Sequence, residues 1–140
     1  MDRAAPDVSR EALEAATPEA VRAACAPECW RLEDLWSLDL PRVRLALQEL
    51  TRLLDLPLWQ RNGVRFQISP NEVLRYPERF PHHMRRIDEA DLSRPIHVLR
   101  RDGRWTVLDG YHRLAAAVRR QDPAIDAWLV SEGDLAAIVR

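Results

Sequence analysis

The sequence predicts an α+β fold, and three local patterns support this class. Residues 43–54 repeat apolar side chains at helical spacing. Residues 95–99 and 105–108 are strand-like runs that flank Asp102-Gly103, a dipeptide typical of hairpin turns. The second run leads through a short turn into an alanine-rich helical segment. We therefore expect a small mixed sheet with flanking helices in residues 63–140, preceded by an N-terminal helical extension in residues 1–62.

The extension carries several helix signals. Ser9 is a candidate N-cap for a helix that begins near residue 10, and Thr17-Pro18 is a second start signal. The amphipathic pattern of residues 43–54 predicts one more helix. Trp30 and Trp36 lie between these helices, where tryptophan is more typical of packing than of ligand binding. The apolar helix faces need a surface to cover, which is either the sheet of the same chain or a second subunit in a homodimer.

Residues 63–140 alternate between strand and helix patterns. Proline-rich residues 75–95 are expected to form mostly loop, with one helical turn around residues 84–90. The other expected elements are a strand at 64–68, a helix capped by Ser69 with Pro70 at N1, a helix at 112–120, a strand at 125–130 and a last helix after Ser131.

The composition is that of an ordinary folded chain of 140 residues, with 46% apolar and 31% charged residues. The net charge is -1, from 21 basic and 22 acidic side chains, which argues against a general polyanion binder. All the basic side chains are arginine. This excludes mechanisms that require a P-loop lysine, a Schiff-base lysine or a kinase-type lysine. A bound phosphate must be held by Arg, His or backbone N–H groups.

The expected cellular compartment follows from two features that the sequence lacks, a membrane span and a secretory segment. No apolar run approaches 18 residues, and no apolar secretory segment opens the chain. We therefore expect no membrane association and a cytoplasmic location. Cys25 and Cys29 lie four residues apart without further ligands nearby, which favours free thiols in a reducing compartment over a metal site.

The segment WTVLDGYHRLAAAVRR is the most informative part of the sequence. A helix that begins directly after a strand and a glycine turn presents backbone N–H groups to a ligand beyond the strand. His112 and Arg113 fall in the first helical turn, where a cation is disfavoured unless an anion is bound. In the alternative interpretation, Arg113 pairs with a carboxylate and His112 packs or faces solvent. Asp109 is either the helix N-cap, a partner of His112 or a ligand of phosphate-bound Mg²⁺.

Residues 64–130 resemble the ParB/sulfiredoxin-like superfamily in the order ISPNEV, PIHVL, RDG and RWTVLDGYHRLAAA. In that superfamily the strand–turn–helix loop binds nucleotide phosphates. Asp109, Gly110, His112 and Arg113 match the loop in order and spacing. The resemblance covers about half of the chain and implies a nucleotide-binding domain.

Single positions distinguish the branches of this superfamily. Tyr111 replaces the catalytic cysteine of sulfiredoxins, and a phenol cannot replace that thiolate. The helix-turn-helix domain of the partitioning proteins has no counterpart after the last expected strand, so we expect no direct DNA binding and consider a nuclease role weaker still. The loop is most similar to that of free serine kinases, with Tyr111 in place of a histidine. Those kinases hold a catalytic Glu just after the first strand, where this sequence has Glu72.

The resemblance implies a phosphotransferase that uses ATP, ADP or CTP with Mg²⁺ and acts on a small hydroxylated metabolite, as amino-acid kinases do. Glu72 would be the base, Asp109 and His112 would assist catalysis, and Gly110, Tyr111, His112 and Arg113 would hold the nucleotide. The alternative is a regulatory, non-catalytic nucleotide-binding module that acts through a protein partner.

Several of these residues also have structural interpretations. Glu72 is equally well explained as a carboxylate in the first turn of a helix, where acidic residues are favoured. Tyr111 either contacts a nucleotide base or substrate, or packs on the sheet. His97 alternates within a strand and is expected to be structural or at the surface. Residues 79–86 form a cationic loop cluster that either closes over phosphates or is solvated.

Overall fold

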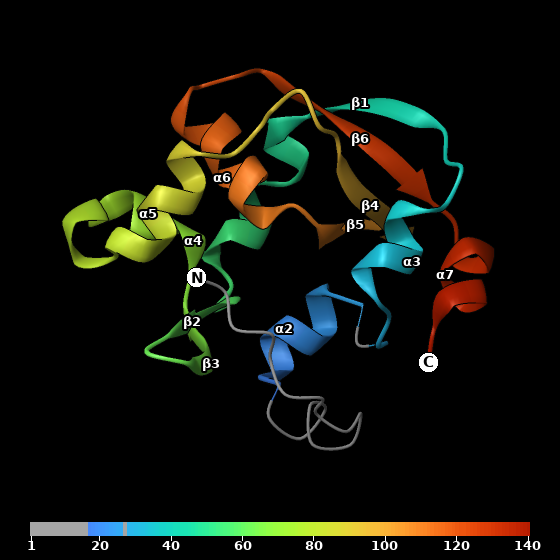
Figure 1. The fold of residues 1–140 in the computed structure, drawn as a ribbon, viewed down its shortest axis with the longest axis horizontal. Coiled ribbons are helices and arrows are strands. Elements are labelled where there is room, and N and C mark those ends of the chain that lie inside the picture. Colours follow the sequence, from blue (N-terminus) through green and yellow to red (C-terminus); the bar gives the residue numbers. More distant parts are fainter. Residues whose placement is uncertain (1–16, 27) are drawn as a thin grey trace.

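The computed structural model describes residues 17–26 and 28–140, and in them the fold is α+β (Figure 1). A four-stranded mixed sheet has the order β1-β6-β4-β5, and a separate two-stranded sheet pairs β2 with β3. The elements are α2 (Glu19–Ala24), α3 (Leu32–Trp36), β1 (Arg42–Ala46), η1 (Leu47–Glu49), η2 (Thr51–Asp55), β2 (Trp59–Arg61), β3 (Val64–Ile68), α4 (Pro70–Arg75), η3 (Pro77–Arg79), α5 (Pro81–Asp88), β4 (Ile96–Arg101), β5 (Arg104–Asp109), α6 (Tyr111–Arg119), β6 (Ala124–Val130) and α7 (Glu132–Ile138).

The register of the main sheet brings four residues into one row. β1 and β6 are antiparallel, with Arg42 opposite Trp128. β6 and β4 are parallel, with Trp128 opposite His97. β4 and β5 are antiparallel, with His97 opposite Asp109 beside a β-bulge. Because paired residues lie at the same height on neighbouring strands, these four positions follow one line across the sheet.

Apolar side chains cover both faces of the sheet. On one face, the buried leucines of residues 45–54 pack against Ile96, Val98 and Leu114, which joins η1, η2 and α6 to the strands. On the other face, α3 and α7 lie side by side (Figure 1) and bury Leu35 and Leu135 against the sheet. A third cluster holds β2, β3, α4 and α5 against α6.

The prediction of a helix over residues 43–54 is wrong. Residues Arg42–Ala46 form β1, and two short 3-10 helices follow. Within β1 the side chains alternate between exposed arginine and more buried Val43 and Leu45, so a two-residue period overlaps the helical one. Arg42 and Arg44 both pair with Asp126 on β6, which favours the strand pairing. Residues on both sides of position 62 therefore share one sheet, and residues 1–62 are not helical throughout.

The turn and cap predictions are confirmed where a local signal decides the backbone. The β4–β5 hairpin turns at Asp102 and Gly103, both with positive φ. Ser69 caps α4 and Ser131 caps α7, each with a capping box. The helix expected from Ser9 lies outside the described residues.

Some elements are longer than expected or were not expected. In place of one helical turn around residues 84–90, the eight residues Pro81–Asp88 form α5, because Pro81 occupies the N1 position, where proline starts a helix. The short strand β2 appears because it pairs with β3. Helix α3 covers the sheet with Leu35.

In the described part of the chain, no helix is both long and apolar enough to cross a membrane.

Candidate functional site

Gly110 determines the backbone at the junction of β5 and α6. It is the N-cap of α6 with φ 114° and ψ 26°, in the left-handed region. A Cβ at this position would lie 2.5 Å from Cγ2 of Ile96 and 2.9 Å from its Cβ. The turn therefore needs glycine both for its φ and for the close approach of β4. Asp109, which the sequence left as a candidate N-cap, is instead the last residue of β5.

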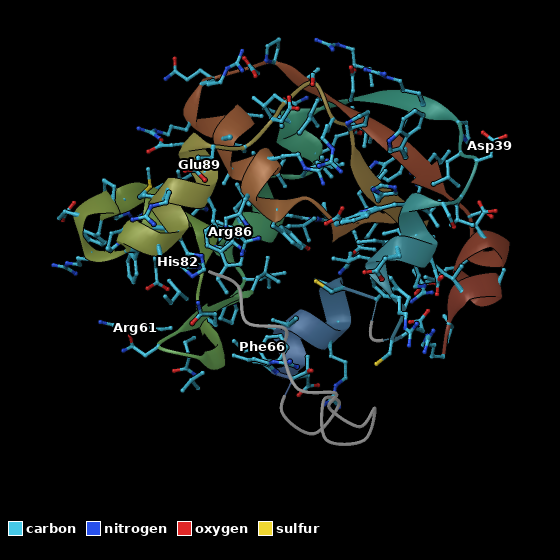
Figure 2. All side chains as sticks on the ribbon, viewed as in Figure 1. Asp39, Arg61, Phe66, His82, Arg86 and Glu89 are labelled. Atoms are coloured by element: carbon cyan, nitrogen blue, oxygen red, sulfur yellow. The ribbon has the colours of Figure 1, made fainter. Side chains whose placement is uncertain are left out.

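A cavity of about 440 Å³ opens at this junction, and we call it the α6 cavity. The first turn of α6 contains no acidic residue, and no side chain caps its N–H groups. These orphan donors and the helix dipole make this end of α6 favourable for an anion. Arg86 and Glu89, labelled in Figure 2, line the cavity from α5. Its lining residues are Trp36, Trp59, Arg86, Glu89, Ala90, Asp91, Arg94, Leu108, Asp109, Gly110, Tyr111, His112 and Arg113.

Arg113 is held by contacts within the protein. Its guanidinium donates to the carbonyl oxygens of Pro95 at 2.7 Å and Arg94 at 3.2 Å, and to Oδ2 of Asp109 at 3.0 Å. The same Oδ2 accepts a hydrogen bond from Nε1 of Trp36 at 2.9 Å. The interpretation in which Arg113 pairs with a neighbouring carboxylate is therefore confirmed. Arg113 and Asp109 shape the wall of the cavity, and their charges largely offset one another.

His112 belongs to an aromatic stack. Its Nε2 lies 3.2 Å from Nδ1 of His83, and Nε2 of His83 donates to the carbonyl oxygen of Gln60 at 2.8 Å. The centre of the Trp59 ring lies 4.1 Å from that of His112 and 4.7 Å from that of His83. The two imidazoles are 5.5 Å apart, so both cover the same face of the indole.

Burial dominates the electrostatics of His112. It lowers the pKa of the imidazole to about 3, with further lowering from the positive charge of Arg86 and from His83 and His82. His112 is consequently neutral near pH 7. It offers a nucleotide hydrogen bonding and a ring surface, and no positive charge.

Tyr111 lines the α6 cavity but also packs into the protein. Its ring packs against two of the core clusters, and its hydroxyl lies 3.5 Å from Sγ of Cys25. Burial raises the pKa of Tyr111 well above its usual value, with a further contribution from Cys25. Most of the Tyr111 ring is therefore packed inside the protein, as one of the two interpretations expected. Cys25 and Cys29 are free, half-buried thiols.

Glu72 lies apart from the other predicted residues. It is exposed at the start of α4, where its Oε1 accepts from the backbone N–H of Ser69 at 3.3 Å. In return, Oγ of Ser69 accepts from the N–H of Glu72 at 3.1 Å, which completes a capping box. Glu72 is not among the residues that line the α6 cavity. The structure brings together Asp109, Gly110, Tyr111, His112 and Arg113, and it does not bring Glu72 to them.

Two lining residues, Trp36 and Arg94, were not predicted as site residues from the sequence. Trp36, assigned to packing, is 49% exposed and donates to Asp109. Arg94 lies 5.8 Å from the ring of Trp36 and precedes the proline that starts the hairpin. Arg86 belongs to the cationic cluster of residues 79–86, expected either to close over phosphates or to be solvated, and it lies on α5. No local pattern places Trp36 and Arg94 at this site, because they come from separate segments that meet only in the folded chain.

The carboxylates around the cavity decide whether Mg²⁺ could bind there. Among the described residues, no group of three His, Cys, Asp or Glu side chains is arranged to hold a metal ion. Glu89, Asp91 and Asp109 line the cavity separately. Mg²⁺ commonly binds through one or two carboxylates together with substrate phosphates, so this donor set fits an ion that arrives with a nucleotide.

Neither a protein-family model, nor a curated protein, nor a solved structure matches the chain.

Proposed function

We propose that the α6 cavity binds the phosphates of a nucleoside di- or triphosphate such as ATP, ADP or CTP. The observation that carries this proposal is the start of α6, where a left-handed glycine turn opens a helix N-terminus without acidic residues onto a cavity. Backbone N–H groups in this arrangement bind phosphate oxygens. The resemblance of Asp109-Gly110-Tyr111-His112-Arg113 to a phosphate-binding loop supports the same proposal, and with it a ParB/sulfiredoxin-like fold.

Arg86 and Arg94 supply the positive charge in this proposal. Both are exposed and line the cavity, and among the described residues neither has a salt bridge to a carboxylate. Arg113, whose guanidinium is already engaged, instead positions the loop by bonding Asp109 and the carbonyl oxygen of Pro95. Charge-assisted hydrogen bonds from guanidinium groups to phosphate are among the strongest polar contacts in proteins.

We further propose that the bound nucleotide donates a phosphoryl group to a small hydroxylated metabolite. Such transfer depends on positioning and on neutralising the charge of the phosphates. Mg²⁺, held by the cavity carboxylates, would supply part of that neutralisation. Arg86 and Arg94 would supply the rest, while the N–H groups of α6 orient the phosphates.

A regulatory nucleotide-binding module is the second candidate function. It is favoured by Glu72, the expected base, whose carboxylate serves the capping box of α4. In this alternative, nucleotide binding changes the surface offered to a protein partner and no group is transferred.

Titration calorimetry of ATP, ADP and CTP in the presence of Mg²⁺ tests the binding proposal. We expect Arg86→Gln to weaken binding about ten- to hundredfold, because it removes a charge-assisted contact of ~1.5–3 kcal/mol. Arg44→Gln is the matched control, since Arg44 pairs with Asp126 and does not line the cavity. If none of the three nucleotides binds, the proposal is wrong.

An assay of nucleotide turnover separates the two candidate functions. The protein would be incubated with the nucleotide that binds and with a panel of hydroxylated metabolites, and release of ADP or AMP would be measured. Turnover that depends on one acceptor supports phosphoryl transfer. Tight binding without turnover across the panel supports the regulatory module.

A further inference from the structure

A second cavity of about 400 Å³ lies beside the α6 cavity, and we call it the His97 cavity. Asp39, labelled in Figure 2 on the segment that precedes β1, is one of its lining residues. Trp36, Arg94 and Arg113 line both cavities, so the two spaces share a wall. The residues that line the His97 cavity are Trp36, Leu38, Asp39, Leu40, Arg42, Ser93, Arg94, Pro95, His97, Arg113 and Trp128.

The sheet itself supplies three of these residues. Arg42, Trp128 and His97 occupy one row across β1, β6 and β4. The guanidinium of Arg42 lies 5.7 Å from the centre of the Trp128 ring. The cavity is therefore built on regular strands, which hold side chains more rigidly than loops do.

His97 is a buried imidazole whose hydrogen bonding is incomplete. It is 6% exposed, and its Nδ1 has no hydrogen-bond partner within the described residues. Oδ2 of Asp109 lies 3.8 Å from this nitrogen, which is too long for a hydrogen bond. Burial without a partner is costly for a polar group, so such a group in a native structure calls for an explanation. A small shift of Asp109 would complete the bond and fix the orientation of the ring that lines the cavity.

The charges of the lining favour an anion. Among the described residues that line the cavity, Arg42, Arg94 and Arg113 are basic and Asp39 is the one carboxylate. Arg42 and Arg113 already pair with acidic residues, but Arg94 has no such partner in the part of the chain that the structure describes. Arg94 therefore has a free hydrogen-bonding edge, and Arg42, which bonds Asp126 through Nη2, has further N–H donors.

The aromatic walls favour a ligand with a planar or apolar body. Trp36 and Trp128 both line the cavity, and each has an arginine near its ring. A guanidinium fork beside an indole face matches a carboxylate attached to a flat or apolar group, because the fork binds the two oxygens while the indole covers the body.

We propose that the His97 cavity binds a small organic carboxylate. The carboxylate contacts Arg94 and Arg42, the body of the ligand lies between the indoles, and His97 offers a hydrogen bond to a polar substituent such as a hydroxyl. That this ligand is the phosphoryl acceptor rests on the proposed function, but its binding does not.

Histidine signals in NMR spectra test this proposal, because the chain has only four histidines. His97 lines the His97 cavity and His112 lines the α6 cavity, so each site has its own reporter. Signals are assigned from the spectra of His97→Gln and His112→Gln. The probes are 4-hydroxybenzoate, L-serine, benzyl alcohol, inorganic phosphate and ADP with Mg²⁺. We expect 4-hydroxybenzoate or L-serine to shift the signals of His97, and ADP to shift those of His112.

Two arginine variants separate the cavities. Arg42→Gln should weaken carboxylate binding about tenfold and leave ADP binding unchanged, whereas Arg86→Gln should do the reverse. Arg44→Gln, which removes the other salt bridge to Asp126, should preserve both. Carboxylate binding without binding of ATP, ADP or CTP would overturn the proposed function and leave the His97 cavity supported.

Other outcomes overturn the inference itself. It is wrong if neither acid shifts the His97 signals, or if Arg42→Gln binds the acid as well as the unmodified chain does. Equal binding of benzyl alcohol would show that the carboxylate is not recognised. Equal binding of inorganic phosphate would show a general anion site in place of the proposed carboxylate site.

Discussion

At the scale of single residues, Gly110 and Gly103 both have positive φ but differ in their surroundings. A Cβ on Gly110 would collide with Ile96, whereas a Cβ on Gly103 would meet nothing within 4 Å. We expect Gly110→Ala to lower the free energy of unfolding by more than ~2 kcal/mol, because strain and overpacking add. Gly103→Ala should cost about 1 kcal/mol, from φ alone. Denaturant unfolding measures both, and equal losses would contradict the close approach of β4.

His112 makes the stability depend on pH in a defined direction. Its pKa of about 3 in the folded protein lies below the unfolded value of ~6.5. The unfolded chain therefore takes up the proton first as the pH falls. The stabilisation is complete above pH ~6.5 and is lost as the pH falls toward 3, at a slope of up to ~1.4 kcal/mol per pH unit.

His112→Gln should remove this contribution. We expect the variant to show a shallower loss of melting temperature between pH 6 and pH 4 than the unmodified chain. His97 also has a lowered pKa, caused mainly by burial, so some slope should remain in the variant. An unchanged slope would show that His112 is not buried in its neutral form.

At the scale of elements, variants at the start of α4 distinguish a helix-capping role of Glu72 from a role as catalytic base. Ser69→Ala should cost about 1 kcal/mol, since it removes the N-cap acceptor. Glu72→Gln should preserve stability, because glutamine also serves the third helical position of a capping box. We expect this variant to keep both nucleotide binding and transfer. A loss of turnover of ~10²–10⁴-fold with binding intact would instead assign Glu72 as the base.

The elements that the sequence predicted are those whose signals are local. Ser69, Ser131 and the Asp102-Gly103 turn determine their own caps or backbone angles. β1 could not be predicted in the same way, because residues 43–46 satisfy both a helical and a strand period. Pairing with β6 favours the strand over the helix, because β6 offers an open edge and Asp126. Likewise, β2 exists only as the partner of β3.

At the scale of the whole molecule, the main sheet joins both halves of the chain. β1 forms one edge of it, and five buried leucines between residues 45 and 54 belong to the same core as Ile96 and Val98. We expect a fragment of residues 63–140 to lack a cooperative thermal transition, because it loses a strand and a large part of this core. Circular dichroism during heating measures this. A fragment that melts at the temperature of the full chain would contradict the shared core.

The candidate site was only partly predictable for the same reason. The loop from Asp109 to Arg113 is contiguous, and its residues do surround one cavity. Arg86, Arg94 and Trp36 come from separate segments and meet only in the folded chain, where α5 packs against α6 and α3 packs against the sheet. His97, expected to be structural or at the surface, is buried. The row that joins it to Trp128 depends on strand register, which no local sequence pattern predicts.

Trp36 and Arg94 stand between two cavities, and this position has a thermodynamic consequence. One guanidinium cannot give the same hydrogen bonds to two anions at once. If the proposed nucleotide and carboxylate occupy the two sides, their affinities are linked, and linkage is reciprocal, so each changes the binding of the other by the same factor. Because both ligands would draw on one arginine, the complex that holds both is then less stable than the sum of the two separate binding free energies.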